Sequence, residues 1–312
     1  MRVVLTGAAG MLGSSIARAW AAQRPGDEIV ALSRSVVDLR DGAATASTIA
    51  EIKPDAVIHA AARVAGIAEK LAAPATFLQQ NLQIDSSVIS AAIAAEVPEL
   101  LYISSGAIYP AETAQPIAEV ALLTGRLEPA NEGYALAKIT GGMLCSYAST
   151  QYGYAYRAAV PSNLYGTGDS FAEGRSHLVA STIAKAHTAV GAGDDQIEVW
   201  GDGTARREFT FADDLAEWLV GQVGAIEAWP ALLNLGVGVD HSIREYYEAA
   251  ARATGFTGRF DYDTTKPSGV PQRLLDSSRA RTLGWNPGTT LDEGYARVYA
   301  AYLDSTGNER HR

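Results

Sequence analysis

The sequence predicts an α/β fold in which a doubly wound parallel sheet is followed by a smaller α/β lobe. Short apolar runs alternate with alanine-rich segments of helical spacing through the first half of the chain. The runs are continuously apolar, as in strands that are covered by helices on both faces of a parallel sheet. Right-handed crossovers between such strands place helices on both faces, which makes the sheet doubly wound.

The order of the elements follows from this alternation. We expect strands at about 3–6, 29–32, 56–59, 100–104 and 154–160, and helices at about 11–23, 44–52, 70–95 and 132–152. The second half predicts a loop at 161–175, helices at about 176–191, 213–224 and 242–254, and strands at 196–200 and 232–235. We assign 1–160, completed by parts of 205–240, to a dinucleotide-binding domain. We assign 161–204 and 241–312 to a substrate-binding lobe that ends in a polar tail at 308–312.

Composition excludes several classes of protein. The 312 residues include 25 Lys and Arg against 35 Asp and Glu, so the formal net charge is −10. This balance argues against nucleic acid or an anionic membrane as the main partner. The sequence has no apolar stretch of about 18 residues, and its N-terminal apolar run is too short for a signal peptide, so we expect a cytoplasmic protein. A single cysteine, Cys145, excludes an intramolecular disulfide and a cysteine-based zinc site, and we expect no metal.

A glycine-rich turn follows the first predicted strand. Gly7, Gly10 and Gly13 stand three residues apart, with Met11 and Leu12 where the next helix begins. In a dinucleotide site such glycines allow a tight turn, a close approach to the pyrophosphate and close packing of helix on strand. The helix N-terminus supplies unpaired N–H groups for the phosphates. The turn therefore predicts dinucleotide binding, with a purely structural turn as the alternative.

The end of the second strand bears on the choice between NAD and NADP. An acidic residue there binds the ribose 2′-hydroxyl of NAD. This chain instead has Ser33, Arg34 and Ser35, which suit a 2′-phosphate. The segment favours NADP over NAD, and a solvated loop arginine is the alternative for Arg34. We place Asp38, in the same segment, among the cofactor contacts.

A catalytic set is predicted at the ends of the fourth strand and the helix that follows. Tyr134 and Lys138 are four residues apart, on one face of a helix. The lysine cation lowers the pKa of the phenol, which then exchanges a proton with a sugar or alcohol oxygen while a hydride moves. Ser105 ends the fourth strand, where active sites of doubly wound sheets lie, and can hydrogen-bond the reacting oxygen. Ser104 supports the turn.

With these motifs in place, the chain resembles the extended short-chain dehydrogenase/reductase family over nearly its whole length. Within that family it is most similar to the GDP-L-fucose synthase branch, NADPH-dependent epimerase/reductases of a GDP-linked 4-keto-6-deoxy sugar. The matching segments are 127–134, 163–166, 200–204, 207–209 and 266–269. The resemblance implies a Rossmann domain, an NADP cofactor, a GDP-sugar substrate and a homodimer formed through helices 70–95 and 132–152.

The resemblance also implies roles for individual residues. It adds to the cofactor site, beside Tyr134 and Lys138, the residues Ala60, Ala61, Ala62, Asn81, Pro161, Asn163, Leu164 and His177. It assigns to the substrate Ala107, Asn163, Lys185, Trp200, Arg207 and Lys266. Arg207 would hold the diphosphate bidentately and Trp200 would line the nucleotide pocket. From the residues alone, Arg207 can equally be a surface charge and Trp200 a core aromatic. His177 corresponds to the branch's acid histidine, so it is catalytic or substrate-binding.

One departure from the branch changes the expected chemistry. The residue two before Tyr109 is a cysteine in the branch and carries protons at the carbons that flank the ketone, but here it is Ala107. Alanine carries no proton, and we expect Cys145 to be a core residue. Epimerisation needs a base and an acid on opposite faces, so His177 lacks its partner. We therefore predict a C4 ketoreductase whose C3/C5 epimerisation is lost or reduced.

Three alternatives remain open at this point. One is a complete epimerase/reductase. The second is a nucleotide-sugar 4-epimerase or dehydratase that recycles a tightly bound NAD, against which Arg34 and the Gly106–Ala107 pair weigh. The third is a non-catalytic NADP-binding sensor, against which the intact Tyr134 and Lys138 weigh.

Overall fold

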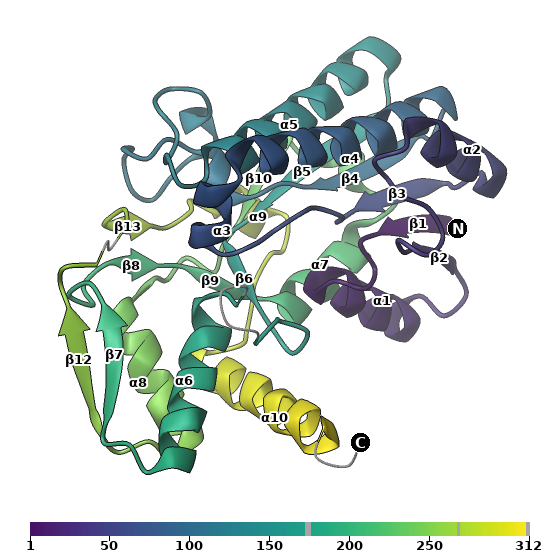
Figure 1. Cartoon of the computed structure of the whole chain (residues 1–312). Coiled ribbons are helices and arrows are strands. Elements are labelled where there is room, and N and C mark those ends of the chain that lie inside the picture. Colours follow the sequence, from purple (N-terminus) through teal and green to yellow (C-terminus); the bar gives the residue numbers. More distant parts are fainter. Residues whose placement is uncertain (172–175, 267–268, 310–312) are drawn as a thin grey trace.

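A six-stranded parallel sheet forms the centre of the molecule (Figure 1). The computed structural model describes residues 1–171, 176–266 and 269–309. The strand order is β10-β5-β4-β3-β1-β2, and every neighbouring pair is parallel. The strands are β1 (Arg2–Thr6), β2 (Glu28–Leu32), β3 (Ala56–His59), β4 (Glu99–Ile103), β5 (Ala155–Pro161) and β10 (Leu232–Leu235). The prediction of a doubly wound parallel sheet is confirmed.

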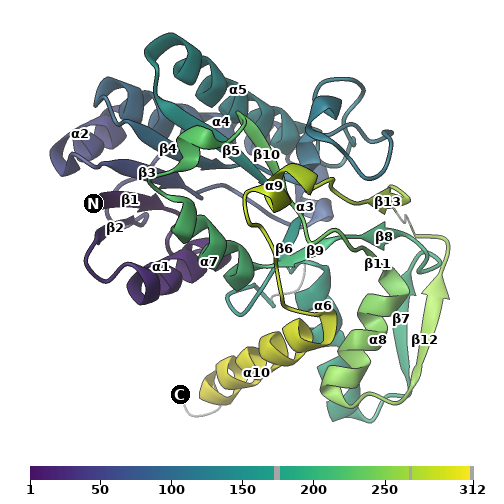
Figure 2. The same ribbon diagram turned by 180° about the vertical axis from the view of Figure 1, so that it is seen from behind.

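Helices cover both faces of this sheet (Figures 1 and 2). On one face lie α1 (Met11–Gln23) and α7 (Ala212–Gln222), and on the other α2 (Gly42–Ile52), α4 (Pro74–Ala94) and α5 (Glu132–Tyr152). Every residue of β3 and β4 is buried, which is why these strands read as unbroken apolar runs in the sequence. The main core therefore forms two layers, one on each side of the sheet.

Two predicted elements were wrong in detail. The helix expected at 70–95 is two helices, α3 (Ile67–Ala72) and α4, because Pro74 opens α4 and Ala73 leaves the helical conformation (φ −138°, ψ 49°). Proline fits the first turn of a helix but cannot continue one from before. The loop expected at 161–175 contains a short strand, β6 (Asn163–Tyr165), paired with β9 (Phe209–Phe211), and 172–175 lie outside the described residues. A pairing of segments so distant in sequence leaves no local signal.

The smaller lobe adjoins the carboxyl ends of the sheet strands, because the chain passes from β5 directly into β6. Its core lies among α6 (Leu178–Ala192), α8 (Ile243–Thr254) and α10 (Leu291–Glu309). Its strands are β7 (Gln196–Trp200), β8 (Arg206–Arg207), β11 (His241–Ser242), β12 (Arg259–Asp263) and β13 (Gln272–Arg273). β7 pairs with β12, and β8 lies between β11 and β13. The predicted tail begins inside α10, and 310–312 lie outside the described residues.

Short helices complete the chain: η1 (Gly106–Ile108), η2 (Glu119–Ala121), η3 (Ile226–Ala228) and α9 (Ser278–Thr282). β10 comes from the second half of the sequence and extends the sheet beyond β5. The division into two domains stays a prediction. In the part of the chain that the structure describes, no helix combines the length and the apolar character that a membrane span requires.

Candidate active site

The glycine turn brings three backbone segments into close contact. Gly7 has a left-handed φ of +71°, and a Cβ on it would lie 2.7 Å from the backbone nitrogen of Ala61. A Cβ on Gly13 would collide with the carbonyl oxygen of Gly7. Only glycine fits at these two positions, so the strand, the turn and α1 are locked to the segment after β3. The N-terminus of α1, at Gly10, has no side-chain cap. Its free N–H groups suit an anionic ligand.

The loop that follows β6, at the start of the smaller lobe, packs on the glycine turn. A Cβ on Gly168 would lie 3.2 Å from Cα of Met11, and one on Gly166 would lie 3.6 Å from the Met11 sulfur. Pro161, Asn163 and Leu164, which the sequence assigned to the cofactor, lie just upstream at the end of β5 and in β6. The predicted cofactor segments after β1, β3 and β5 therefore meet at one edge of the sheet.

The segment after β2 is basic and exposed. The hydroxyls of Ser33 and Ser35 are 2.7 Å apart and flank the exposed Arg34. Asp38 pairs with Arg40 at 2.6 Å, and hydrogen bonds from Arg40, with the charge of Arg34 in addition, lower the pKa of Asp38 to about 2. The carboxylate of Asp38 is thus occupied by a neighbouring arginine, and its contact with a cofactor stays a prediction.

Asn81 is fully buried and its amide is used within the protein. Its Nδ2 donates to the carbonyl oxygens of Phe77 and Arg63, and its Oδ1 accepts from the Arg63 backbone N–H at 2.8 Å. The side chain therefore holds the segment that follows Ala60, Ala61 and Ala62 in place. A direct contact of Asn81 with a cofactor stays a prediction.

Tyr134 and Ser105 come together as the sequence predicts. Tyr134 lies near the start of α5 and is 8% exposed, with the Ser105 side chain among its polar neighbours. Burial, with the charge of Asp85 in addition, raises the pKa of the Tyr134 phenol, and Ser105 partly offsets this, so the lowered pKa expected from Lys138 was wrong. Ser105 also accepts the backbone N–H of Ala107 at 3.2 Å, which fixes the start of η1. The site thus holds a protonated phenol, suited to donate a proton.

Lys138 lies one turn further along α5 and is paired with Asp85. Its Nζ is 3.3 Å from the Asp85 carboxylate and 4.6 Å from the ring centroid of Tyr102. Lys138 also lines a cavity of about 200 Å³. The hydroxyl of Ser104 lines the same cavity and is buried with no hydrogen-bond partner among the described residues. The ion pair with Asp85 therefore holds the Lys138 ammonium in the interior of the protein.

His177 begins α6 and is oriented by a carboxylate. Its Nδ1 is 3.3 Å from Oδ1 of Asp169, whose side chain is 5% exposed. The other oxygen of Asp169 is buried without a hydrogen-bond partner in the described part of the chain. A histidine held through Nδ1 presents Nε2 to a ligand. Arg175, two residues before His177, lies outside the described residues.

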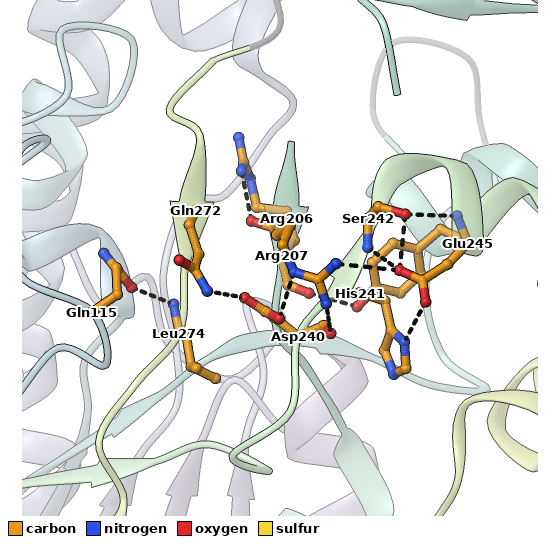
Figure 3. Close-up of polar contacts among 10 residues, drawn as sticks. Gln115, Arg206, Arg207, Asp240, His241, Ser242, Glu245, Gln272 and Leu274 are labelled. Atoms are coloured by element: carbon orange, nitrogen blue, oxygen red, sulfur yellow. Dashed lines mark hydrogen bonds and ion pairs between the residues drawn. The ribbon is translucent and has the colours of Figure 1, made fainter. Parts of the chain in front are cut away.

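Neighbouring arginines of β8 have different partners (Figure 3). Arg206 donates to the carboxylate and the carbonyl oxygen of Asp240 and lies 3.6 Å from Glu245. Successive side chains of a strand leave opposite faces, so Arg207 does not share this cluster. Arg207 donates to the backbone oxygen of Arg206. Arg207 thus lies outside the Asp240 cluster, and its contact with a ligand stays a prediction.

Arg207 belongs to a half-buried cluster with Arg273 and Glu128. Burial lowers the pKa of both arginines, the charge of Glu128 raises it in both, and Arg273 lowers it further in Arg207. Glu128 accepts from Asn131, and Asn131 accepts from Lys70, whose Nζ lies 5.1 Å from the Tyr134 ring centroid. Glu128 thus connects the two arginines to Asn131 and Lys70, beside Tyr134.

Lys185, Trp200 and Lys266 gather around β7. Lys185 donates to the backbone oxygen of Glu198 and to the Tyr247 hydroxyl. Trp200 donates to the Glu198 carboxylate, and Lys266 lies 5.7 Å from its ring centroid. Trp200 is 57% exposed, so it is no core aromatic. Pro267 and Ser268 of the predicted 266–269 motif lie outside the described residues.

Comparison with known proteins identifies the family of this chain. Residues 3–231 match the model of the NAD dependent epimerase/dehydratase family. The chain belongs to this family. GDP-L-fucose synthase of Azorhizobium caulinodans is 39% identical over 308 residues, which cover 99% of this chain and 97% of that protein. GDP-L-colitose synthase of Yersinia pseudotuberculosis is 36% identical over 311 residues, which cover 99% and 100%.

A solved structure extends the comparison to the whole fold. The GDP-mannoheptose C4 reductase from Campylobacter jejuni with NADP bound is 28% identical, with a TM-score of 0.87. The match covers 96% of this chain and 98% of that one. The family resemblance inferred from the motifs is therefore confirmed, both in sequence and in fold.

Several residues in or beside the candidate site were not predicted from the sequence. Asp85, Asp169, Lys70 and Arg273 contact or neighbour predicted site residues, but none lies in a recognisable motif. Only Asp85 had a usable signal. It follows Asn81 by four residues and precedes Val88 and Ile89, which places an acid on the buried face of a predicted helix.

Glu208, beside Arg207, predicts a pH dependence of stability. Burial raises the pKa of Glu208 from 4.5 to about 7, although backbone N–H groups of Leu275 and Gly238 donate to it. The folded protein holds this proton more tightly than the unfolded chain does. The contribution of Glu208 to stability is therefore full below about pH 4.5 and is lost as the pH rises through about 7.

We expect the free energy of unfolding of the wild type, relative to that of a Glu208→Gln variant, to fall by about 3 kcal/mol from pH 4.5 to pH 8. Urea unfolding of both proteins across this range measures the difference. Because glutamine does not titrate, a difference that stays constant with pH would contradict the raised pKa.

Proposed function

We propose that this protein is an NADPH-dependent C4 reductase of a GDP-linked 4-keto-6-deoxy sugar, with C3/C5 epimerisation lost or reduced. The observation that carries the proposal is the buried Tyr134, beside Ser105 at the same sheet edge as the glycine turn, with a methyl group at Ala107. Relatives named GDP-L-fucose synthase and GDP-L-colitose synthase, and a GDP-mannoheptose C4 reductase, support the class of substrate.

The residues that would hold the cofactor fit NADP. The open N-terminus of α1 suits the pyrophosphate, and Arg34 with Ser33 and Ser35 suits the 2′-phosphate. The neighbouring reductase structure with NADP bound supports this choice. When bound, NADPH supplies the hydride for C4 of the sugar. Bound NAD, recycled in an epimerase, is the poorer fit because no acid ends β2.

The side chains of the site then act on the keto oxygen. Ser105 orients that oxygen by a hydrogen bond, and Tyr134 donates its proton to the nascent alkoxide. Lys138 would stabilise the phenolate that remains and bind the nicotinamide ribose. Burial keeps the phenol protonated until the hydride moves, and it excludes water from the reacting atoms.

The GDP moiety would lie against cationic side chains of the smaller lobe. Arg207, with Arg273 beside it, suits the diphosphate, and the exposed Trp200 with Lys266 suits the nucleoside. Lys185 contributes from α6. A homodimer through α4 and α5 is part of the same proposal, because α5 exposes Leu136 and Tyr147.

A second candidate is a complete epimerase/reductase. The names of the two curated relatives favour it, and so does the Asp169–His177 pair, which retains an acid on one face of the sugar. The two candidates differ in whether C3 and C5 exchange protons with water during turnover.

Replacing Tyr134 by Phe tests the proton donor. We expect kcat to fall about 10²- to 10⁴-fold, because general acid catalysis contributes this much, while the dissociation constant of NADPH changes less than about threefold. Absorbance at the NADPH band measures turnover, and fluorescence titration measures binding. Tyr152→Phe, an exposed tyrosine at the far end of the same helix, is the matched control. Near-normal turnover of Tyr134→Phe would refute the assignment.

Deuterium incorporation tests the role of Ala107. In deuterated water we expect the wild type to place deuterium at C3 and C5 far more slowly than it reduces C4. Ala107→Cys restores a proton carrier opposite His177 and should raise that incorporation at least about tenfold, as general acid–base groups do. Ala107→Ser, of similar size but a much weaker acid, serves as control. Mass spectrometry that finds exchange at the normal catalytic rate in the wild type would favour the complete epimerase/reductase.

Arg34→Ala tests the cofactor choice. Loss of a charged hydrogen bond to the 2′-phosphate should weaken NADPH binding about tenfold or more and leave NADH binding within about twofold. Arg18→Ala, an exposed arginine of α1 paired with Asp213, should change neither. Equal weakening for both cofactors in Arg34→Ala would argue against a 2′-phosphate contact.

A further inference from the structure

A closed network of polar side chains is buried beneath Tyr134. Its members come from five different elements of the large domain and are each no more than 2% exposed. They are Thr6, His59, Asp85, Tyr102 and Lys138. Buried polar groups in such numbers are costly unless each finds a partner, so the hydrogen bonds among them define what the network does.

Asp85 is the point on which the network converges. Its Oδ2 accepts the Tyr102 hydroxyl at 2.6 Å. Its Oδ1 accepts from His59 Nε2 at 3.1 Å and from Lys138 Nζ at 3.3 Å. A carboxylate can accept all three bonds, so every polar contact of Asp85 is a donor pointing at a negative charge.

The remaining bonds settle the protonation state of His59. The backbone N–H of Ala61 donates to the Thr6 hydroxyl oxygen at 3.2 Å, and the Thr6 hydroxyl lies 2.7 Å from His59 Nδ1. The Asp85 carboxylate only accepts, so His59 Nε2 carries the proton that points to it, and Nδ1 accepts the Thr6 hydroxyl hydrogen. His59 is then neutral, with its proton on Nε2, and burial lowers the pKa of His59 in agreement.

The network therefore contains one anion and one cation. Burial alone would raise the pKa of Asp85, but the charge of Lys138 and the bonds from His59 and Tyr102 lower it below its ordinary value. Removal of one member of a buried ion pair leaves the other unpaired at a cost of several kcal/mol. Asp85 thus fixes where the Lys138 ammonium rests.

The same anion acts on Tyr134. After burial, the charge of Asp85 is the next cause that raises the pKa of the Tyr134 phenol. The titratable groups packed around Asp85 and Tyr134 among the described residues are Lys138, His59, Tyr102, Cys145 and, over the Tyr134 ring, Lys70. Of these, Lys138 is the cation in contact with Asp85, at 3.3 Å, so Asp85 is the anion that acts on both Lys138 and Tyr134.

We propose that Asp85 is a positioning residue that holds the Lys138 ammonium beneath Tyr134 and offsets part of its charge, so that Tyr134 stays a phenol able to donate its proton. The proposal rests on the reductase function proposed above. It makes the site asymmetric: a lone Lys138 would favour the phenolate, which accepts protons in alcohol oxidation, whereas the pair favours the proton donor needed for ketone reduction.

The experiment compares Asp85→Asn with the wild type in NADPH-dependent reduction across pH. The amide keeps the shape and removes the charge. We expect kcat to fall about tenfold or more, and the alkaline limb of kcat/KM to move down by at least about half a pH unit, because the phenol ionises more readily. The dissociation constant of NADPH should change less than about threefold.

Glu99→Gln is the matched control. Like Asp85, Glu99 is a buried carboxylate. It lies on β4 and accepts the backbone N–H of Gly224, away from the network. We expect it to lower stability without moving the alkaline limb. An Asp85→Asn enzyme with the wild-type limb and turnover, or a Glu99→Gln enzyme with an equal shift, would overturn the proposal. A wild type that reduces no GDP-4-keto sugar contradicts the proposed function instead.

A double variant keeps the proposal testable where Asp85→Asn alone does not fold. Asp85→Asn combined with Lys138→Met removes both charges, which a buried site tolerates better than one unpaired charge. If Asp85 acts through Lys138, the double variant should have a kcat within about threefold of Lys138→Met alone. A further tenfold loss would show a separate role for Asp85 and overturn the proposal.

Discussion

The contact between Gly13 and the carbonyl of Gly7 is the constraint on which the rest of the site depends. No side chain fits between α1 and the end of β1, so the first helix starts at a fixed distance from the sheet. The same closeness brings Gly7 against Ala61, and the Ala61 N–H begins the chain of hydrogen bonds that runs through Thr6 and His59 to Asp85. The turn suited to phosphates and the pair beneath Tyr134 are therefore parts of one rigid assembly.

Charge in this acidic chain is arranged locally. A net charge of −10 gives no general attraction for an anionic ligand. Arg206 and Arg40 are committed to Asp240 and Asp38. Arg34 is instead exposed beside Ser33 and Ser35, and Arg207 lies near Arg273 and Glu128. These are the two arginines that the proposed function assigns to phosphate groups of the ligands.

The sequence predicted what depends on local pattern. Continuous apolar runs located all five strands of the first half, and the glycine spacing located the turn. Cys145 is fully buried, as expected for a core residue. Apart from the helix break at Pro74, which had a local signal, what failed depends on distant partners: β6 exists because β9 lies beside it, and Lys138 is anchored by Asp85, 53 residues earlier. The two arginines of β8 leave opposite faces of the strand, and the partner of Arg206 is Asp240, 34 residues away. No single-chain pattern encodes such pairings.

The two halves of an epimerase's proton machinery have separate structural support, which explains how one can be lost alone. His177 is held by its position at the start of α6 and by its contact with Asp169, which lies in the loop after β6. Ala107 lies in η1, a turn fixed by its own N–H bond to Ser105 and packed near the end of β4. A methyl group there leaves that bond and the buried Tyr134 undisturbed, because neither uses the side chain at 107. In the proposed reductase, proton donation by Tyr134 therefore does not require a proton carrier at position 107.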